Sequence, residues 1–392
     1  MRIFTLLVNV YDESHHGGTQ VVAQETGRRL VERGHEVTFL ARRPNRDIPL
    51  QENCDGVDVR RYDVDFRPAA IEASRKAAKR LWDEKPFDVL HTHFAYCAIG
   101  PSLAIPASVP RLRTFHGAWD QEADAGWGGP EAATIKRLKR GFRRWVEARD
   151  IRRSDAVVTL SEHSKRYVLE RFNKAPASVH TVGGGVDFKR FVLVADKKSL
   201  RRKLRLPADG PLVMFAGRLV RPKGPFELLA AMQRFISIEP AAHLVIVGDG
   251  AERRALEETA AALGIDEHVH FAGYVHERMS EYYAAADVLV LASHIPETFG
   301  LVTAEALACG LPVIGAPLGA TVDILKGLES RLLMKGTSAD DIFEALQAFF
   351  SADWSRALGP DIVRAYALEH FSWERHAERV EQICQELIRK KR

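Results

Sequence analysis

The chain has 392 residues, of which 46% are hydrophobic and 28% are charged, and its formal net charge is +4. This composition is typical of a folded globular protein and excludes a largely disordered chain. The small net charge gives no support to nucleic-acid binding, and the length favours two domains.

The cysteines and the N-terminal segment favour a reducing compartment. The four cysteines lie far apart and form no CxxC pair, so they predict neither a disulfide framework nor a zinc knuckle. The N-terminal apolar run has no signal-peptide pattern, and no apolar stretch reaches the length of a membrane span. We therefore expect a cytosolic protein.

Short apolar runs alternate with helical patterns along both halves of the chain. Continuous apolar strands between helices indicate parallel sheets that are buried on both faces. The sequence therefore predicts an α/β fold of two Rossmann-like, doubly wound domains, 1–187 and 188–370, with a final helix over 371–392 that packs back towards the first domain. The predicted strands are 3–10, 36–41, 89–93, 112–115, 156–160 and 179–182 in the first half, and 212–215, 244–247, 269–271, 288–291, 312–315 and 331–334 in the second.

Ligands of open parallel sheets bind beyond the carboxyl ends of the strands, so the segments after each strand matter most. Gly17 and Gly18 follow the first strand, where backbone N–H groups and a helix N-terminus favour an anion. A tight turn with Thr19 as helix N-cap explains the same residues. His116 follows the strand at 112–115 and is either a site residue or a hydrogen-bonded core histidine.

The second half begins in the same way, with a strand that ends at Gly217. Arg218 and Lys223 follow in one loop, where a guanidinium fork and an ammonium group suit a diphosphate. Solvation of both side chains at the surface is the alternative. The later stretch "VIVGDGAERRAL" begins like a dinucleotide fingerprint, but Arg253 occupies the position of its third glycine.

Two glutamates stand in the largely apolar stretch "ETFGLVTAEALACGLPVIG". Glu297 lies in the loop before a predicted helix, and Glu305 lies within that helix among apolar neighbours. A buried carboxylate needs hydrogen-bond partners, which a ligand rich in hydroxyl groups or the backbone can supply. The N–H groups of Phe299, Gly300 and Leu301 at the helix start favour an anion. Phosphate and polyol chemistry between two such domains is typical of a nucleotide-sugar enzyme.

At this point the sequence resembles the retaining GT-B glycosyltransferases of family 4. The resemblance extends over nearly the whole chain and keeps the family's order of motifs. The stretches that carry it are "GGTQVVAQETGRRLVERGHEVTFLA", "TFHG", "DAVVTLSEHSKRYV", "GGGVDFKRF", "FAGRLVRPKG", "VIVGDGAERRAL", "VHFAGYV" and "PETFGLVTAEALACGLPVI". Where the family has two glycines, an apolar residue, Pro and Glu, this chain has Gly319 to Asp323, and ligand contact there stays open.

The resemblance implies transfer of a hexose-type sugar from a nucleoside-diphosphate sugar, the donor, to a hydroxyl acceptor in polysaccharide, glycolipid or glycoside biosynthesis. It assigns the donor diphosphate to Arg218 and Lys223, the ribose to Glu305 and the donor sugar to Glu297. His116 would approach the sugar near the reacting carbon. The further donor-binding residues that it implies are Gly17, Gly18, Gly217, Tyr274, Val275, Phe299, Gly300 and Leu301.

Fixed cations near the departing phosphates can stabilise the leaving group, so we expect no metal and no other cofactor. Asp63 and Asp65 spell a DxD pattern, but their spacing places both on one solvated face of a strand-like segment. No residue stands out as a nucleophile, which suits front-face attack with the leaving phosphate taking the acceptor proton.

The acceptor side is less defined. The segment Ile135 to Asp155 holds nine basic residues and repeats apolar residues at helical spacing, so it either packs with a solvated basic face or docks on an anionic membrane or acceptor. Trp119, Asp120 and Trp127 are candidate acceptor contacts. Two alternatives remain. One is a nucleotide-sugar-binding protein without activity. The other is a nicotinamide-dependent oxidoreductase, which would need a complete glycine fingerprint that neither half of the chain has.

Overall fold

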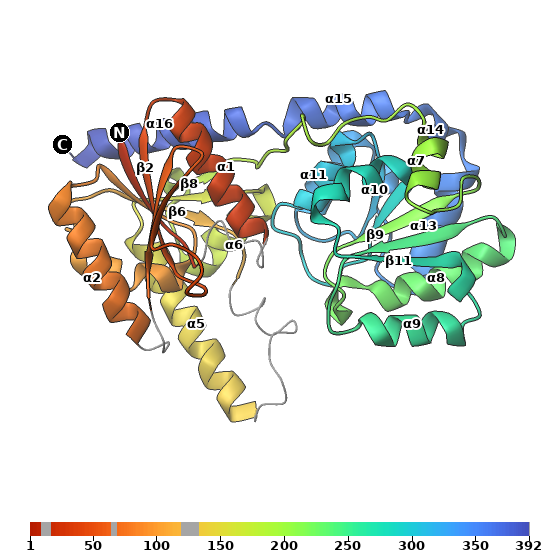
Figure 1. Ribbon diagram of the computed structural model, residues 1–392, viewed down its shortest axis with the longest axis horizontal. Helices are drawn as coiled ribbons and strands as arrows, with labels where there is room; N and C mark the ends of the chain where they lie inside the picture. The colour runs from red at the N-terminus through yellow and green to blue at the C-terminus, as the bar shows by residue number, and fades with distance from the viewer. Residues whose placement is uncertain (9–16, 64–68, 119–132, 392) are drawn as a thin grey trace. The chain divides into compact units, whose positions relative to one another are not determined.

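The computed structural model describes residues 1–8, 17–63, 69–118 and 133–391. Contacts between Cα atoms divide the chain into two compact units (Figure 1). Unit 1 comprises Met1–Gly184 and Trp373–Arg392, and unit 2 comprises Gly185–Ser372. Each unit contains one sheet with helices on both of its faces, so the α/β fold of two Rossmann-like domains is confirmed.

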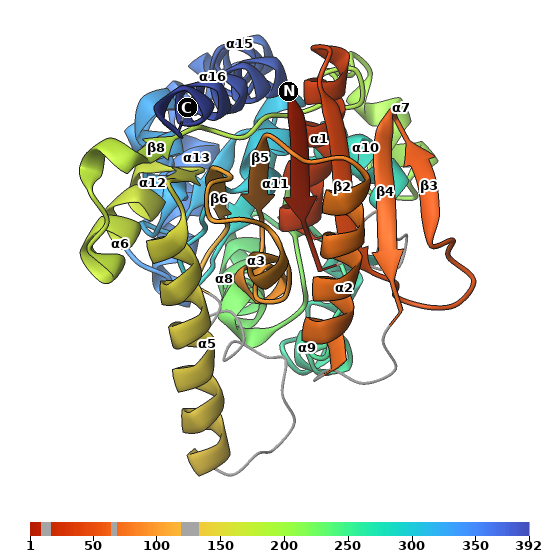
Figure 2. The same ribbon diagram turned by 90° about the vertical axis from the view of Figure 1, so that its left-hand side faces the viewer.

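Unit 1 is built on an eight-stranded sheet in the order β3-β4-β2-β1-β5-β6-β7-β8. All neighbouring strands are parallel except β3, which runs antiparallel to β4 at one edge (Figure 2). The strands are β1 Arg2–Leu6, β2 Glu36–Arg42, β3 Gln51–Cys54, β4 Val57–Tyr62, β5 Val89–Thr92, β6 Arg111–Phe115, β7 Ala156–Thr159 and β8 Val179–Thr181. The helices are α1 Gly18–Glu32, α2 Ala69–Glu84, α3 Pro101–Ala104, α5 Ala133–Arg153, α6 Glu162–Phe172 and α16 Trp373–Lys391, with short 3-10 turns η1 Ala95–Ala98 and η2 Pro176–Ser178.

Alternate residues of β1 bury opposite faces of this sheet. Ile3 packs into a cluster that contains Leu30 of α1 and Ile383 of α16. Phe4, the next residue, packs into a second cluster with Leu81 of α2. The period of two along a strand therefore assigns α1 and α16 to one face and α2 to the other.

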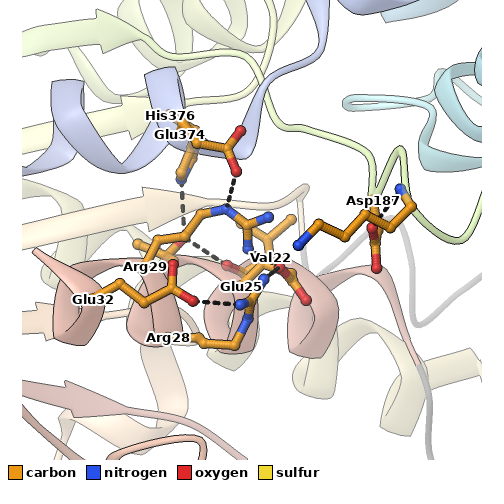
Figure 3. Close-up of polar contacts among 10 residues, drawn as sticks. Val22, Glu25, Arg28, Arg29, Glu32, Asp187, Glu374 and His376 are labelled. Carbon is orange, nitrogen blue, oxygen red and sulfur yellow. Dashed lines mark hydrogen bonds and ion pairs between the residues drawn. The ribbon is translucent and has the colours of Figure 1, made fainter.

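The final helix α16 is held against α1 by polar contacts as well as by apolar packing (Figure 3). Arg29 of α1 donates to Glu374 at 3.1 Å and also pairs with Glu25 of its own helix. His376 donates from Nδ1 to the Gly183 carbonyl at 2.9 Å, and its Nε2 lies 3.0 Å from the Thr26 hydroxyl. The last 20 residues of the chain are thus part of unit 1.

Unit 2 is built on a five-stranded, fully parallel sheet in the order β11-β10-β9-β12-β13. The strands are β9 Leu212–Ala216, β10 His243–Val247, β11 Val269–Gly273, β12 Val288–Leu291 and β13 Val313–Gly315. The helices are α7 Lys197–Lys203, α8 Pro225–Ile238, α9 Arg253–Ala262, α10 Met279–Ala285, α11 Leu301–Ala308, α12 Ala320–Leu328, α13 Ala339–Ser351, α14 Asp353–Ala357 and α15 Pro360–His370. The 3-10 turns are η3 Arg221–Lys223, η4 Asp266–His268, η5 His276–Arg278 and η6 Ser330–Leu332.

Two features of the sheets differ from the sequence-based prediction. The run at 331–334 forms no strand, since Leu333 makes only an isolated bridge to Gly315 after the turn η6. The hairpin of β3 and β4 was not predicted, because its residues are largely polar and charged: the strands read QENC and VDVRRY. Only alternate residues of β4 are buried, with Val57 and Val59 in the core, so the hairpin lacks the continuous apolar run on which the strand prediction rested.

Candidate functional site

The order of the strands in unit 2 puts a topological switch point beside β9. The chain runs from β9 to β10 and β11 on one side, and β12 and β13 lie on the other side. The loops that leave β9 and β12 at their carboxyl ends therefore diverge, which is where open α/β sheets bind ligands. These two loops carry Arg218, Lys223 and Glu297.

The two loops are joined by backbone contacts. The N–H group of His294 donates to the carbonyl of Pro222 at 2.8 Å. Gly224 has a positive φ of 71°, and a Cβ there would lie 2.2 Å from the carbonyl oxygen of Ala292. Only glycine fits this close approach without strain, so the position of Lys223 depends on its neighbour in the chain.

Lys223 and Glu297 form an ion pair between these loops. Nζ of Lys223 lies 2.5 Å from Oε1 of Glu297, and the side chains are 20% and 26% exposed. Their partial burial strengthens the pair relative to one in full contact with water. The backbone of Glu297 is fixed as well, because its carbonyl accepts from Ala320 at 2.8 Å and lies against Gly319. The segment at Gly319, for which no role was predicted, thus supports Glu297.

Helix α11 begins at this site with open backbone N–H groups. Its N-cap is Gly300, with a φ of 81° and no side chain to accept from the first turn. The hydroxyl of Thr303 in that turn is buried and has no hydrogen-bond partner among the described residues. The helix start therefore offers donors and positive potential to an anionic ligand. Phe299, which precedes the start of α11 in the chain, is buried and packs edge-on against Phe371.

Glu305 lies one turn further along α11 and has an unusual protonation equilibrium. Burial raises the pKa of its carboxyl group to about 7, while the hydroxyl of Tyr283 and the charge of Arg190 lower that pKa in part. Tyr283, which is fully buried in α10, donates to Oε2 of Glu305 at 3.1 Å. This supporting residue was missed, because nothing in its local sequence connects it with a residue 22 positions away.

The glycines of "GDG" in the loop after β10 serve packing between loops. A Cβ at Gly248 would lie 1.9 Å from the Gly217 carbonyl oxygen, and one at Gly250 would lie 2.5 Å from that of Leu219. They allow the loop after β10 to lie on the loop after β9, which carries Arg218. Arg218 and Tyr274 are exposed, and Val275 is partly exposed.

In unit 1, Gly17 and His116 both follow strands at their carboxyl ends. Gly17 is the N-cap of α1, so the helix begins before Thr19 and the alternative with Thr19 as N-cap is wrong. His116 follows β6, and its Nε2 lies 2.9 Å from Nδ1 of His93. Burial lowers the pKa of both imidazoles well below the ordinary value, so both rings are neutral at neutral pH.

Other predicted residues lie outside this arrangement or outside the described residues. Trp119, Asp120, Trp127 and Asp65 are not among the described residues. Asp63 follows β4 and pairs with Arg43 at 3.3 Å. Within the described ranges, no three His, Cys, Asp or Glu side chains gather in a way that could hold a metal ion.

Comparisons with known proteins identify the family of the chain. Residues 16–190 match the family model described as Glycosyltransferase Family 4, and residues 196–357 match the one described as Glycosyl transferases group 1. The chain is 31% identical to the D-inositol 3-phosphate glycosyltransferase of Geodermatophilus obscurus over 389 residues, which cover 92% of this chain and 82% of that protein. It is 30% identical to D-inositol 3-phosphate glycosyltransferase 1 of Catenulispora acidiphila, over 93% of this chain and 89% of that protein.

Solved structures show the same fold. Sucrose-phosphate synthase from Thermosynechococcus elongatus superposes with a TM-score of 0.82 at 26% identity, over 99% of both chains. HepE of Anabaena, solved with UDP and glucose, superposes with a TM-score of 0.75 at 16% identity, over 97% of this chain and 98% of that chain. With family models over both halves of the chain and full-length relatives at about 30% identity, the chain belongs to the family 4 glycosyltransferases and is a glycosyltransferase enzyme of the GT-B type.

Proposed function

We propose that this enzyme transfers a hexose from a nucleoside-diphosphate sugar to a hydroxyl group of its acceptor, with retention of the anomeric configuration. The observation that carries the proposal is the pair of Lys223 and Glu297 at the switch point of unit 2. A cation for the phosphates and a carboxylate for sugar hydroxyls stand side by side there, next to the open N-terminus of α11.

The donor is held mainly by unit 2. Lys223 and Arg218 bind the diphosphate, together with the N–H groups of Phe299, Gly300 and Leu301, and Gly217 leaves room for it, since a Cβ there would meet no atom within 4 Å. Glu305 accepts from the ribose hydroxyls, and the nucleobase lies by Tyr274 and Val275. Structural neighbours support a nucleotide ligand: HepE of Anabaena was solved with UDP-glucose, and starch synthase IV of Arabidopsis thaliana with ADP and acarbose.

Unit 1 contributes to the sugar and to the donor phosphates. His116 contacts the sugar near the reacting carbon, and Gly17 and Gly18 lie on the phosphate side. The helix α1 that begins there has no acidic residue in its first turn, so its positive end stays open to an anion.

In the transfer step the bond between the anomeric carbon and the phosphate oxygen breaks first, and an oxocarbenium-like centre develops. Lys223, Arg218 and the α11 N–H groups stabilise the charge that grows on the departing diphosphate. The acceptor hydroxyl then bonds to the anomeric carbon on the same face, and its proton passes to a phosphate oxygen of the leaving group. These cations do the work for which other enzymes use a metal, so we expect full activity in EDTA.

The test is turnover with a panel of UDP-, GDP- and ADP-sugars, with released nucleoside diphosphate as the readout. D-inositol 3-phosphate is the first acceptor to add, because relatives at about 30% identity carry it in their name. Release with one donor, increased by an acceptor, supports transfer. Binding without release in the whole panel would contradict it and would leave a nucleotide-sugar-binding protein.

We also propose that the cytoplasmic enzyme docks on an anionic bilayer through α5. In both views α5 extends away from the rest of unit 1 (Figures 1 and 2). Four apolar residues recur along it at intervals of three or four and are exposed: Ile135 by 48%, Leu138 by 73%, Phe142 by 48% and Trp145 by 56%. An apolar stripe in a strongly basic helix is typical of helices that lie in a membrane interface. None of the described helices is long and apolar enough to cross a bilayer, so such docking would be peripheral.

A second copy of the same helix is a poor occupant for this stripe, since nine basic residues on each helix would repel each other. Flotation with phosphatidylglycerol vesicles tests the docking. The L138S/F142S variant should lose most vesicle binding, whereas I238S, which removes an isoleucine that is 52% exposed on α8, should keep it. Equal binding of both variants, or binding to phosphatidylcholine alone, would contradict the proposal.

A further inference from the structure

Three histidines of unit 1 lie next to one another at the carboxyl ends of two adjacent strands. His91 lies in β5, His93 directly follows β5, and His116 directly follows β6. The ring centroids of His91 and His93 are 4.3 Å apart, and those of His93 and His116 are 5.1 Å apart. Nδ1 of His93 and Nε2 of His116 form a hydrogen bond of 2.9 Å.

Because both rings are neutral, one hydrogen lies between these two nitrogens. Burial, the largest cause, lowers the pKa of His93 and His116 well below the ordinary value, and neighbouring positive charges lower it further. Each neutral imidazole has a single N–H group. Either His93 donates from Nδ1, or His116 donates from Nε2.

The surroundings of His93 favour the first arrangement. His93 is 1% exposed, and its Nε2 has no hydrogen-bond partner among the described residues. If His116 were the donor, His93 would carry its hydrogen on Nε2 as a buried N–H group without an acceptor, and such groups are rare in proteins.

A buried cation close to the rings helps to keep both imidazoles neutral. The guanidinium group of Arg113 lowers the pKa of both His93 and His116, so its positive charge reaches both rings. It is buried and held in place by Asp150 at 3.2 Å and by the Thr92 carbonyl at 3.3 Å. This cation disfavours a second proton on either ring and therefore supports the neutral state of both imidazoles.

We infer that His93 is a positioning residue that donates from Nδ1 to His116 and thereby fixes His116 in the tautomer with its hydrogen on Nδ1. His116 is partly exposed, and no described residue takes its Nδ1 as a hydrogen-bond partner. A neutral N–H donor is therefore presented to an oxygen of the ligand. The identity of that oxygen rests on the proposed function, in which it belongs to a hydroxyl group of the donor sugar.

The tautomer can be measured without any substrate. Long-range ¹H–¹⁵N correlation spectra of histidine-labelled protein at pH 7.5 distinguish protonated from unprotonated ring nitrogens, and loss of signals in H116Q assigns those of His116. We expect a protonated Nδ1 and an unprotonated Nε2 in the wild-type protein. A protonated Nε2 on His116 would overturn the inference, even if sugar transfer were established.

Variants at His93 test the positioning role. In H93F the donor is gone, so His116 should lose its single tautomer, whereas H93Q, whose amide group still donates, should retain it. H180Q, which changes a half-buried histidine on β8 of the same sheet, is the matched control and should leave the His116 signals unchanged. Unchanged His116 signals in H93F would overturn the role of His93, and the wild-type spectrum decides the tautomer even if H93F fails to fold.

Kinetics separate this inference from the proposed function. With a donor that turns over, H93F should lower kcat at least tenfold with a smaller change in KM, and H93Q should recover part of the loss. If no donor turns over, the proposed function fails while the tautomer assignment stands. If kcat in H93F equals that of the wild type, the contribution of His93 to transfer is contradicted.

Discussion

Lys223 and Glu297 are 74 positions apart in sequence, yet their side chains form an ion pair of 2.5 Å at the switch point of the second sheet. The pair keeps the cation compensated when no ligand is bound. In the proposed function, a diphosphate competes with Glu297 for Lys223, and the donor sugar then supplies Glu297 with new hydrogen-bond donors. The charge of Lys223 is therefore balanced by the carboxylate that we propose binds the hydroxyl groups of the sugar.

Replacing Glu297 should separate phosphate binding from sugar recognition. In E297Q the competing carboxylate is gone, so the nucleoside diphosphate alone should bind as well as or several-fold better than in the wild type. Turnover of the complete donor should fall by roughly 10² to 10³, the scale of losing one hydrogen-bonding group that stabilises a transition state. Calorimetry and product release measure the two effects. E344Q, which breaks the exposed pair with Lys335, is the control and should change neither. Weaker diphosphate binding in E297Q would contradict the competition.

Donor binding should depend on pH through Glu305. Burial raises the pKa of this carboxyl group to about 7 from an ordinary value of 4.5. Below that pH the group is protonated and accepts fewer hydrogen bonds from ribose hydroxyls, so affinity should rise as the pH increases through 7. Titration calorimetry from pH 5.5 to 8.5 checks this, and E305Q should bind weakly and without that pH dependence. A wild-type affinity that falls over this range would show that the protonated form binds.

Gly224 should be required for the shape of the site. In G224A the new Cβ meets the Ala292 carbonyl oxygen in a left-handed backbone conformation. G264A is the matched control, since Gly264 has a similar φ of 68° but no atom within 4 Å of the added Cβ. We expect about 1 kcal/mol loss of unfolding free energy for G264A, from the backbone alone, and a clearly larger loss for G224A. Urea denaturation measures both losses. Equal losses would show that the loops of Gly224 and Ala292 can move apart without loss of unfolding free energy.

The last helix should stabilise unit 1. Ile383 of α16 is 1% exposed within the main cluster of that unit. I383A should therefore cost about 2–5 kcal/mol of unfolding free energy. I362A removes an isoleucine that is 54% exposed on α15 and should have only a small effect. Nucleotide binding by unit 2 should persist in I383A under conditions that leave unit 2 folded. An unchanged denaturation midpoint in I383A would contradict the packing of α16.

The parallel strands of both units other than β4 could be predicted from sequence, because they are short, largely apolar or buried runs between helices. The hairpin of β3 and β4 was not predicted, since β3 is polar and β4 alternates apolar and charged residues instead of forming a continuous apolar run. The run at 331–334 was wrongly predicted to be a strand, because the apolar residues of a 3-10 turn are buried like those of a strand.

The site residues of unit 2 lie in recognisable segments because glycines and charges directly follow apolar strands. The supporting residues in both units were missed: Tyr283 beside Glu305 and Gly319 against Glu297 in unit 2, and His93 beside His116 in unit 1. Each meets its partner only after folding brings distant segments together. The histidines of "HTHF" at the end of β5 were the one available signal. The oxidoreductase alternative is wrong, since the chain is a glycosyltransferase and its "GDG" glycines pack against a neighbouring loop.

Calorimetric titration with UDP, GDP and ADP tests the diphosphate site without any need for the acceptor. K223A removes one of the two cations that we assign to the diphosphate, and K335A removes a lysine from an exposed ion pair elsewhere in unit 2. We predict that one nucleotide binds the wild type and K335A with the same affinity and binds K223A at least tenfold more weakly. Equal affinity for K223A and K335A, or no binding of any nucleotide to the wild type, would contradict a diphosphate site between the loops after β9 and β12.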